Sequence, residues 1–204
     1  HYDRFELFRN FQGAASWYVD HNYHLTDVTA YAINVGNYTA VGKFSGGIDV
    51  KVDHIFSTVL GEDIADVNDR PANQYEKGQD KYFTKEAERL IASGYLDFSR
   101  NIGRMYLSAG ASFSKATDFE LQTNCGADVS YFLSNDLILF ASVNTASRLP
   151  TFTDLYYKSA TQLANPDLQP EKSLTAELGT KYRRGSFQCD GVSFTVKEQI
   201  LSIG

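Results

Sequence analysis

The segment RLPTFTDLYYKSATQLANPDLQPEKS, residues 148–173, decides the fold of this chain. It is polar and aromatic, and it separates two stretches of alternating character, LILFASVNTAS at 137–147 and LTAELGTKYR at 174–183. An alternation of apolar and polar residues is typical of strands with one face in water and one face covered. A long loop between two such strands is the pattern of a strand–loop–strand unit in a membrane β-barrel.

Two-faced strands recur along the chain. Between residues 48 and 57 the even positions are mostly apolar and the odd positions mostly polar. Between 104 and 113 the apolar residues fall on the odd positions, and between 173 and 182 on the even ones. A polar or charged face opposite an apolar face fits a strand that separates a wet interior from lipid.

The connectors alternate in length. Turn-forming residues lie near 100–103, 134–136 and 183–185, whereas the connectors near 60–86, 115–123 and 149–172 are long. Outer-membrane barrels have short turns inside and long loops outside. This rule predicts a first strand at about 1–8, an external loop at 9–24, and strands at 25–36 and 40–59.

These patterns together predict an all-β fold, an antiparallel up-and-down transmembrane β-barrel present in part, with about nine strands. The last of these, after residue 185, is the least regular. The segment TKEAERLI at 84–91 fits either a turn of helix or the charged start of a strand. No helix is required elsewhere.

Composition excludes some functions. The net charge of −6 comes without a basic stripe, which argues against nucleic acid as a partner. A barrel needs no continuous apolar run of about 20 residues, and the chain has none. The 13 Tyr and 14 Phe suit strands and interfacial girdles. Cys125 and Cys189 lie in separate predicted strands, so a disulfide is not expected.

Catalytic and metal-binding chemistry is not expected. His21 and His24 form a close pair in the presumed first external loop, but they supply two metal ligands at most. Acidic residues recur in the long loop at 60–86 without the glycine-pinned spacing of a calcium site, namely Asp63, Asp66, Asp69 and Asp80. We therefore predict no metal site, no cofactor and no enzymatic activity.

The segment 148–173 also resembles a signature of TonB-dependent receptors of the bacterial outer membrane. In that family a late barrel strand runs into Arg-x-Pro-(Thr/Ser)-x-x-(Asp/Glu)-Leu-Tyr, and the following loop closes on Asn-Pro-x-Leu-x-Pro-Glu-Lys-Ser. The matching residues here are Arg148, Pro150, Thr151, Asp154, Leu155, Tyr156, Asn165, Pro166, Leu168, Pro170, Glu171, Lys172 and Ser173. Shorter likenesses, such as AVGKFSGGI at 40–48 and LSAGASFS at 107–114, extend the resemblance over most of the chain.

The resemblance implies a location and a set of partners. Family members are barrels of about 22 strands around an N-terminal plug. They take up a scarce, bulky nutrient such as a ferric siderophore or cobalamin, with the TonB complex pulling on the plug. The implied partners are outer-membrane lipid, the receptor's own plug domain, the TonB complex and a small nutrient ligand.

By this reading residues 1–190 are the C-terminal part of such a barrel, and this fragment is not expected to work alone. Two alternatives stay open. One is a porin-like or structural outer-membrane barrel with passive flow, and the other is a secreted β-sandwich that binds glycans.

Most of the motif is expected to be structural and to lie at the extracellular rim. Pro150, Pro166 and Pro170 remove backbone donors and fix φ, so they suit strand ends and the descent of a loop. Tyr156 and Tyr157 either anchor the membrane interface or contact a ligand. The motif thus identifies a family more sharply than it identifies a binding site.

The pattern changes after residue 190. Relatives usually continue with a strand like VSLFYR, a short polar turn and IIDW, but this chain reads GVSFTVKEQILSIG. One permitted choice of codons, read from the third base of codon 191, encodes CLFYRQGTNIIDW. We therefore predict that residues 191–204 are a frameshifted or aberrant tail, with a divergent last strand as the alternative.

Overall fold

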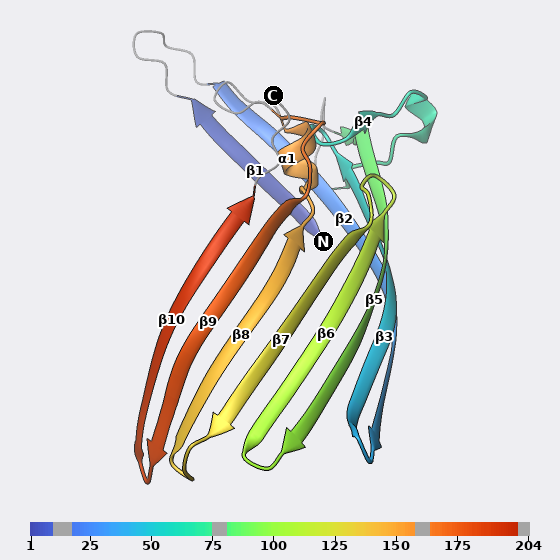
Figure 1. The fold of residues 1–204 in the computed structure, drawn as a ribbon. Helices are drawn as coiled ribbons and strands as arrows, with labels where there is room; N and C mark the ends of the chain where they lie inside the picture. The colour runs from blue at the N-terminus through green and yellow to red at the C-terminus, as the bar shows by residue number, and fades with distance from the viewer. Residues whose placement is uncertain (10–17, 75–80, 158–163, 200–204) are drawn as a thin grey trace. The chain divides into compact units, whose positions relative to one another are not determined.

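The structure, a computed structural model, describes residues 1–9, 18–74, 81–157 and 164–199 and consists almost entirely of strands (Figure 1). The strands are β1 (Tyr2–Arg9), β2 (Tyr18–Thr39), β3 (Gly42–Ser57), β4 (Glu62–Asp63), β5 (Lys85–Ile102), β6 (Met105–Ala116), β7 (Gln122–Phe132), β8 (Leu137–Arg148), β9 (Glu171–Arg184) and β10 (Phe187–Gln199). Within the described ranges the helices are a 3₁₀ turn, η1 (Val67–Asp69), and a short α-helix, α1 (Phe152–Tyr156). No described helix is long and apolar enough to cross a membrane.

The strands β1 to β10 belong to one sheet, whose order follows the chain. The order is β1-β2-β3-β5-β6-β7-β8-β9-β10, and the short β4 pairs with β5 beside this path. The sheet is antiparallel and open, with β1 and β10 at its two ends. This confirms the prediction of an all-β, up-and-down fold that forms part of a barrel.

Short turns join the strands at the lower end in Figure 1, at residues 40–41, 103–104, 133–136 and 185–186. Gly103 and Gly185 have φ of 58° and 60°, a left-handed conformation that suits glycine at a tight turn. The longer connectors precede β5, β7 and β9. The predicted alternation is therefore confirmed for the connectors before β5 and β9, whereas the loop predicted at 115–123 is shorter, at 117–121.

Two predictions were wrong, the start of the second strand and the absence of any required helix outside 84–91. β2 already begins at Tyr18, so His21 and His24 lie in a strand and not in an external loop, while residues 10–17 fall outside the described residues. A strand that continues into water can be polar on both faces, so alternation does not mark it. Residues 85–91 form the start of β5, which is one of the two alternatives left open for this segment, whereas the helix α1 was not expected.

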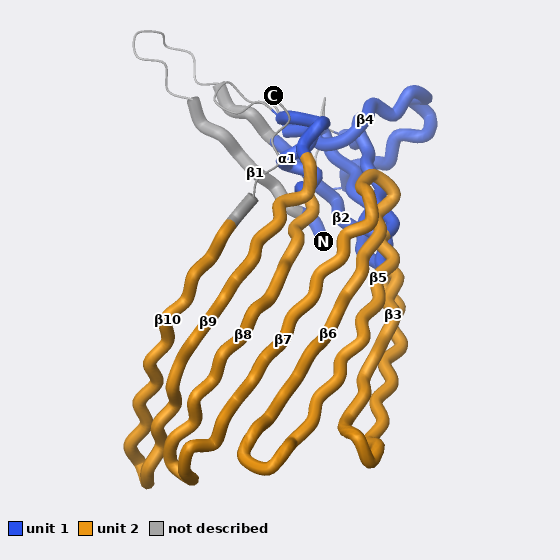
Figure 2. The backbone as a smooth tube through the Cα atoms, viewed as in Figure 1, with its two compact units in different colours: residues 1–29, 51–90, 150–168 blue, residues 30–50, 91–149, 169–204 orange. Residues whose placement is uncertain are grey.

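The chain divides into two compact units (Figure 2). Unit 1 comprises residues 1–29, 51–90 and 150–168, and unit 2 comprises residues 30–50, 91–149 and 169–204. Most of the buried hydrophobic residues belong to unit 1, namely Tyr23, Ile55, Leu60, Ile64, Phe83, Ala87 and Leu155. Unit 1 therefore has the buried core that a loop-rich segment needs for a defined structure.

Unit 2 is a wall of long strands with two different faces. Directly opposite residues share a face, and the register sets Leu107 against Val129 but Ser108 against Asp128. The side of Leu107, here called the apolar face, includes Leu96, Phe98, Phe113, Val129, Leu139, Val143, Leu174 and Leu178. The side of Ser108, the polar face, includes Asp97, Ser99, Ser112, Asn124, Asp128, Ser142, Asn144, Glu177 and Lys181.

The apolar face is uncovered. The relative exposure of Leu96 is 69% and that of Leu178 is 65%, although both are large aliphatic residues in the middle of strands. Soluble proteins rarely expose a continuous apolar surface of this kind. A lipid environment removes its contact with water, as on the outside of a membrane barrel.

Candidate functional site

Two places combine polar side chains with a defined geometry. One is the motif segment, residues 150–168, in unit 1. The other is a hollow on the polar face of unit 2.

The motif segment begins with the one-turn helix α1. Thr151 is its N-cap, where the Asp154 backbone N–H donates to the Thr151 hydroxyl over 3.2 Å. The Thr151 backbone N–H and hydroxyl both donate to the Asp154 carboxylate, over 2.9 and 2.8 Å. This reciprocal capping box satisfies the first free donors of a helix too short to be stable by itself.

Replacing Thr151 by alanine should lower the free energy of unfolding by about 1 kcal/mol, because the helix loses its cap. The measurement is a urea titration of the refolded protein. Thr153→Ala, in the exposed middle of the same turn, is the matched control and should change stability much less. Equal effects of both variants would mean that the capping box does not stabilise this turn.

A buried arginine holds the start of the motif segment. Arg89 of β5 is 6% exposed, and its guanidinium donates to the Pro150 carbonyl oxygen over 2.8 Å. The same guanidinium lies 4.9 Å from the centre of the Phe152 ring. Because both contacts are shielded from water, they bind the motif segment to β5 more strongly than exposed contacts would.

An apolar cluster lies beside this arginine. Ile55, Leu60 and Ala87 form a buried core, against which Val59, Phe152, Tyr156 and Tyr157 pack. Tyr156 and Tyr157, predicted as possible ligand contacts, are therefore half-buried by packing within unit 1. A role in ligand contact stays a prediction.

The second half of the motif forms a compact turn before β9. The Asn165 backbone N–H donates to the Asp154 carbonyl over 3.3 Å, and the Asn165 side chain accepts from the Asp167 backbone N–H over 3.0 Å. Pro150 and Pro170 are both buried at the two ends of the loop. The motif thus combines its Asn and Pro residues in a folded turn, as their turn propensities suggest.

Arg148 and Glu171 lie at the ends of the two strands that flank the loop. They are directly opposite each other at the ends of β8 and β9, and their side chains form an ion pair of 3.1 Å. The side chains are 64% and 45% exposed, so screening by water leaves the pair a contribution of about 0–1 kcal/mol. The pair reflects the register of β8 and β9 and contributes little to the stability of the sheet.

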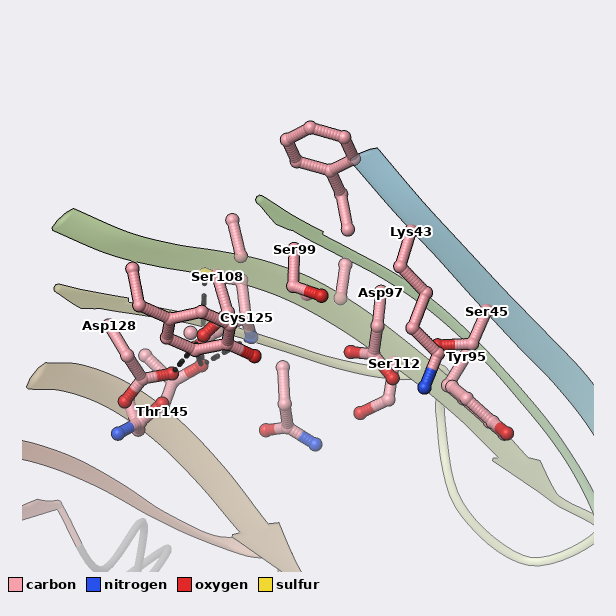
Figure 3. Close-up of a pocket in the computed structure, with 18 residues that line it drawn as sticks. Lys43, Ser45, Tyr95, Asp97, Ser99, Ser108, Ser112, Cys125, Asp128 and Thr145 are labelled. Carbon is pink, nitrogen blue, oxygen red and sulfur yellow. Dashed lines mark hydrogen bonds between the residues drawn. The ribbon is translucent and has the colours of Figure 1, made fainter. Parts of the chain in front are cut away.

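The polar face carries a hollow of about 440 Å³ between β3 and β8 (Figure 3). Its charged residues are Lys43, Asp97 and Asp128, and Ser108 donates to the Asp128 carboxylate over 3.1 Å. Gly110 and Gly126 form part of its lining, and an added Cβ there would collide with the side chains of Asp97 and Asn144. The two glycines thus leave room for the side chains of Asp97 and Asn144 to lie along the wall.

The other residues considered for metal binding are dispersed. His24 lies 2.9 Å from the Ser57 hydroxyl, and His54 lies 3.5 Å from the Glu86 carboxylate. Asp66 caps η1 by accepting from the Asn68 backbone N–H over 2.9 Å, and Asp80 is outside the described residues. Within the described part of the chain, no group of three or more His, Cys, Asp or Glu residues could hold a metal ion.

Asp63 is ion-paired with Lys85 across the β4–β5 pair, over 2.7 Å. The hydrogen bond from Lys85 and then its positive charge lower the pKa of the Asp63 carboxyl below its ordinary value of 3.8. A lowered folded-state pKa makes the pair stabilising above the ordinary value, and this contribution disappears as the pH falls through the lowered pKa.

We therefore expect Asp63→Asn to reduce the acid sensitivity of unfolding below about pH 4, by a small amount because the carboxylate is exposed. Unfolding midpoints between neutral and acid pH measure the effect. Lys85→Gln, which removes the partner of Asp63, should reduce the acid sensitivity in the same way. An unchanged profile for Asp63→Asn would show that the ion pair is not formed in solution.

Sequence reasoning did not identify Arg89 or Ile55 as partners of the motif. Both interrupt the expected pattern, since Ile55 is an apolar residue among polar odd positions and Arg89 is a charge at the alternate position between the apolar Ala87 and Ile91. The helix α1 did have a detectable signal, because Thr-x-x-Asp at 151–154 has the spacing of a capping box.

Comparison with known proteins gives a consistent result. A family model described as "TonB dependent receptor-like, beta-barrel" matches residues 1–196. No curated protein sequence gives a significant match.

Solved structures share the fold at low identity. The siderophore receptor PirA from Acinetobacter baumannii aligns with a TM-score of 0.63 and 17% identity, covering 89% of this chain and 28% of that one. A variant of the ferric enterobactin receptor PfeA from Pseudomonas aeruginosa, in complex with enterobactin, has a TM-score of 0.61 and 15% identity, covering 93% and 29%. The copper transporter OprC has a TM-score of 0.64 and 11% identity, covering 88% and 31%. The chain thus spans less than a third of the length of these proteins.

Proposed function

Because the chain belongs to the TonB-dependent receptor β-barrel family, we propose that it forms part of the wall of an outer-membrane receptor for active uptake of a scarce, bulky nutrient. A ferric siderophore is the first candidate, and cobalamin or a complexed metal is the next. The protein is a transport receptor and not an enzyme. Its partners are outer-membrane lipid, its own plug domain, the TonB complex and the nutrient.

The two-faced wall of unit 2 is the observation that carries this proposal. Its apolar face has Leu96 and Leu178 about two-thirds exposed, at 69% and 65%, which suits contact with lipid. Its polar face has Asp97, Asp128 and Lys43 around the hollow, which suits water, a polar plug or a hydrophilic nutrient. A wall of this kind separates lipid from a hydrophilic passage.

The motif segment serves as a structural landmark in this proposal. The Arg89–Pro150 hydrogen bond and the packing of Tyr156 and Tyr157 against the Ile55 cluster keep one loop in place. A receptor needs such positioned loops where its ligand arrives. Tyr156 and Tyr157 remain the residues of this segment proposed for ligand contact, through the ring surface that packing leaves exposed.

The test is uptake by cells that carry or lack the gene for the full-length protein. Cells are grown under iron limitation or cobalamin limitation and given a panel of radiolabelled ferric siderophores and cobalamin. We expect loss of the gene to remove energy-dependent uptake of one of these compounds. Uptake that persists without TonB would instead support a passive porin, and extraction of the protein into buffer without detergent would contradict a membrane location.

A further inference from the structure

The strand β10 changes its relation to the rest of the wall at Gly191. Before that point the apolar side chains of β10 lie on the apolar face and its polar side chains lie on the polar face. Cys189 is directly opposite Tyr182 on the apolar face, and Asp190 is directly opposite Lys181 on the polar face. In these two pairs each residue is opposite one of similar character.

Beyond Gly191 the two faces are exchanged. Ser193, Thr195 and Lys197 are opposite Leu178, Ala176 and Leu174 of the apolar face. Val192, Phe194 and Val196 are opposite Gly179, Glu177 and Thr175 of the polar face. The relative exposures of Phe194 and Val192 are 68% and 52%, so these apolar side chains gain no cover on the polar side.

The exchange has the form of a shift by one residue. The stretch VSFTVK at 192–197 still alternates regularly, only one position out of step with Phe187 and Cys189. A scrambled sequence would not be expected to keep this alternation. Removing Gly191 would move Val192, Phe194 and Val196 to the apolar face and Lys197 to the face of Glu177.

No bulge absorbs the extra residue. The pairing of β10 with β9 continues one to one through Gly191 and Thr180. A bulge of the glycine type would need Gly191 in a left-handed conformation, and the described glycines with positive φ are Gly42, Gly61, Gly103 and Gly185. A one-residue slip without a bulge necessarily turns every following side chain to the other face.

We propose that Gly191 is one residue too many in β10, and that residues 192–197 therefore lie in the wall with their faces exchanged, Phe194 toward the polar side and Lys197 toward lipid. This proposal rests on the proposed function, because it assumes that the apolar face contacts a membrane. It is an alternative to the predicted frameshift, because a frameshift would alter every residue from 191 onward. The charged side chain of Lys197 on the lipid side should destabilise the part of β10 after Gly191.

Single cysteines test the orientation. The full-length protein is placed in its own outer membrane in a background with Cys125→Ala and Cys189→Ala, and labelled with a membrane-impermeant maleimide. Phe194→Cys should react and Ser193→Cys should be protected, whereas deletion of Gly191 should reverse this order. Protection at 194 with reaction at 193 in the undeleted chain would overturn the proposal, and so would equal reaction at both positions.

The outcome is separable from failure of the proposed function. Leu178→Cys, on the apolar face of β9, reports membrane contact without using β10. It should be protected whenever unit 2 lies in lipid, and its reaction would contradict the proposed function itself. Protection at 178 together with protection at 194 and reaction at 193 would contradict the extra residue at Gly191. It would leave the proposed function intact.

Stability supplies a second measurement. Deletion of Gly191 should raise the thermal unfolding midpoint by several degrees, because three apolar side chains return to lipid and Lys197 leaves it. Gly191→Ala is the matched control, since the added Cβ meets only the Thr180 methyl group at 3.6 Å and the phase does not change. A midpoint that the deletion lowers or leaves unchanged would overturn the proposal.

Discussion

Replacing Arg89 by alanine should lower the free energy of unfolding by about 3 kcal/mol and release the motif segment. The substitution removes a buried charge-assisted hydrogen bond to the Pro150 carbonyl, worth about 1.5–3 kcal/mol, and a contact with the Phe152 ring, worth about 0.5–2 kcal/mol. It also leaves that carbonyl without its donor from Arg89. Urea titration measures the stability, and limited proteolysis within residues 150–168 measures the release of the segment.

Arg104 provides the matched control. It also donates to a carbonyl, that of Leu133, over 3.2 Å, but the bond is exposed. Arg104→Ala should therefore change stability by about 0.5 kcal/mol or less. Arg89→Lys tests whether a positive charge is sufficient. Lysine keeps the charge but lacks the planar group that reaches both the Pro150 carbonyl and the Phe152 ring. An unaltered cleavage pattern in Arg89→Ala would refute the role of this side chain in holding the segment.

Gly61 is the second position at which a small change should have a large effect. Its φ is +106°, and an added Cβ would collide with the carbonyl group of Glu86 on the neighbouring β5. Backbone atoms cannot move aside as a flexible side chain can. Gly61→Ala should therefore cost about 2–5 kcal/mol, from the left-handed conformation and the overpacking together. Urea titration measures this loss.

Gly103→Ala isolates the conformational part of that cost. Gly103 also has a positive φ, 58°, but nothing lies within 4 Å of an added Cβ. The control should therefore lose only about 1 kcal/mol. If the two variants were equally stable, the collision with Glu86 would be relieved in solution, and the close approach of β4 to β5 would be looser than in the structure.

Together these variants probe how the loops of unit 1 are held. The Ile55 cluster, the Arg89 contacts and the β4–β5 pair connect the motif segment and the loop after β3 to a few residues at strand ends. Loops positioned by a rigid scaffold are common carriers of binding function. In the proposed receptor, such loops would determine which nutrient is bound, whereas the wall would be shared among relatives with different nutrients.

The wall could be predicted from the sequence because its signal is local. Each long strand alternates on its own, as from Met105 to Phe113, and the tight turns at 103–104, 133–136 and 185–186 contain their own glycine or asparagine. The boundaries of β2 could not be predicted, because a strand continuing into water loses the alternation that reveals it. The candidate site was predicted only in part, since the motif residues were identified and their partners were not.

The sequence by itself determined the two-faced strands, the alternation of turns and loops, the family likeness and the break in pattern after residue 190. Only the tertiary structure decided that Arg89 and Ile55 meet the motif segment, and that the last strand faces the wrong way beyond Gly191. The physical reason is the range of the interactions. Alternation and turn chemistry act between neighbours in the chain, whereas the Arg89–Pro150 contact joins residues 61 positions apart, and the phase of β10 is defined only by its pairing with β9.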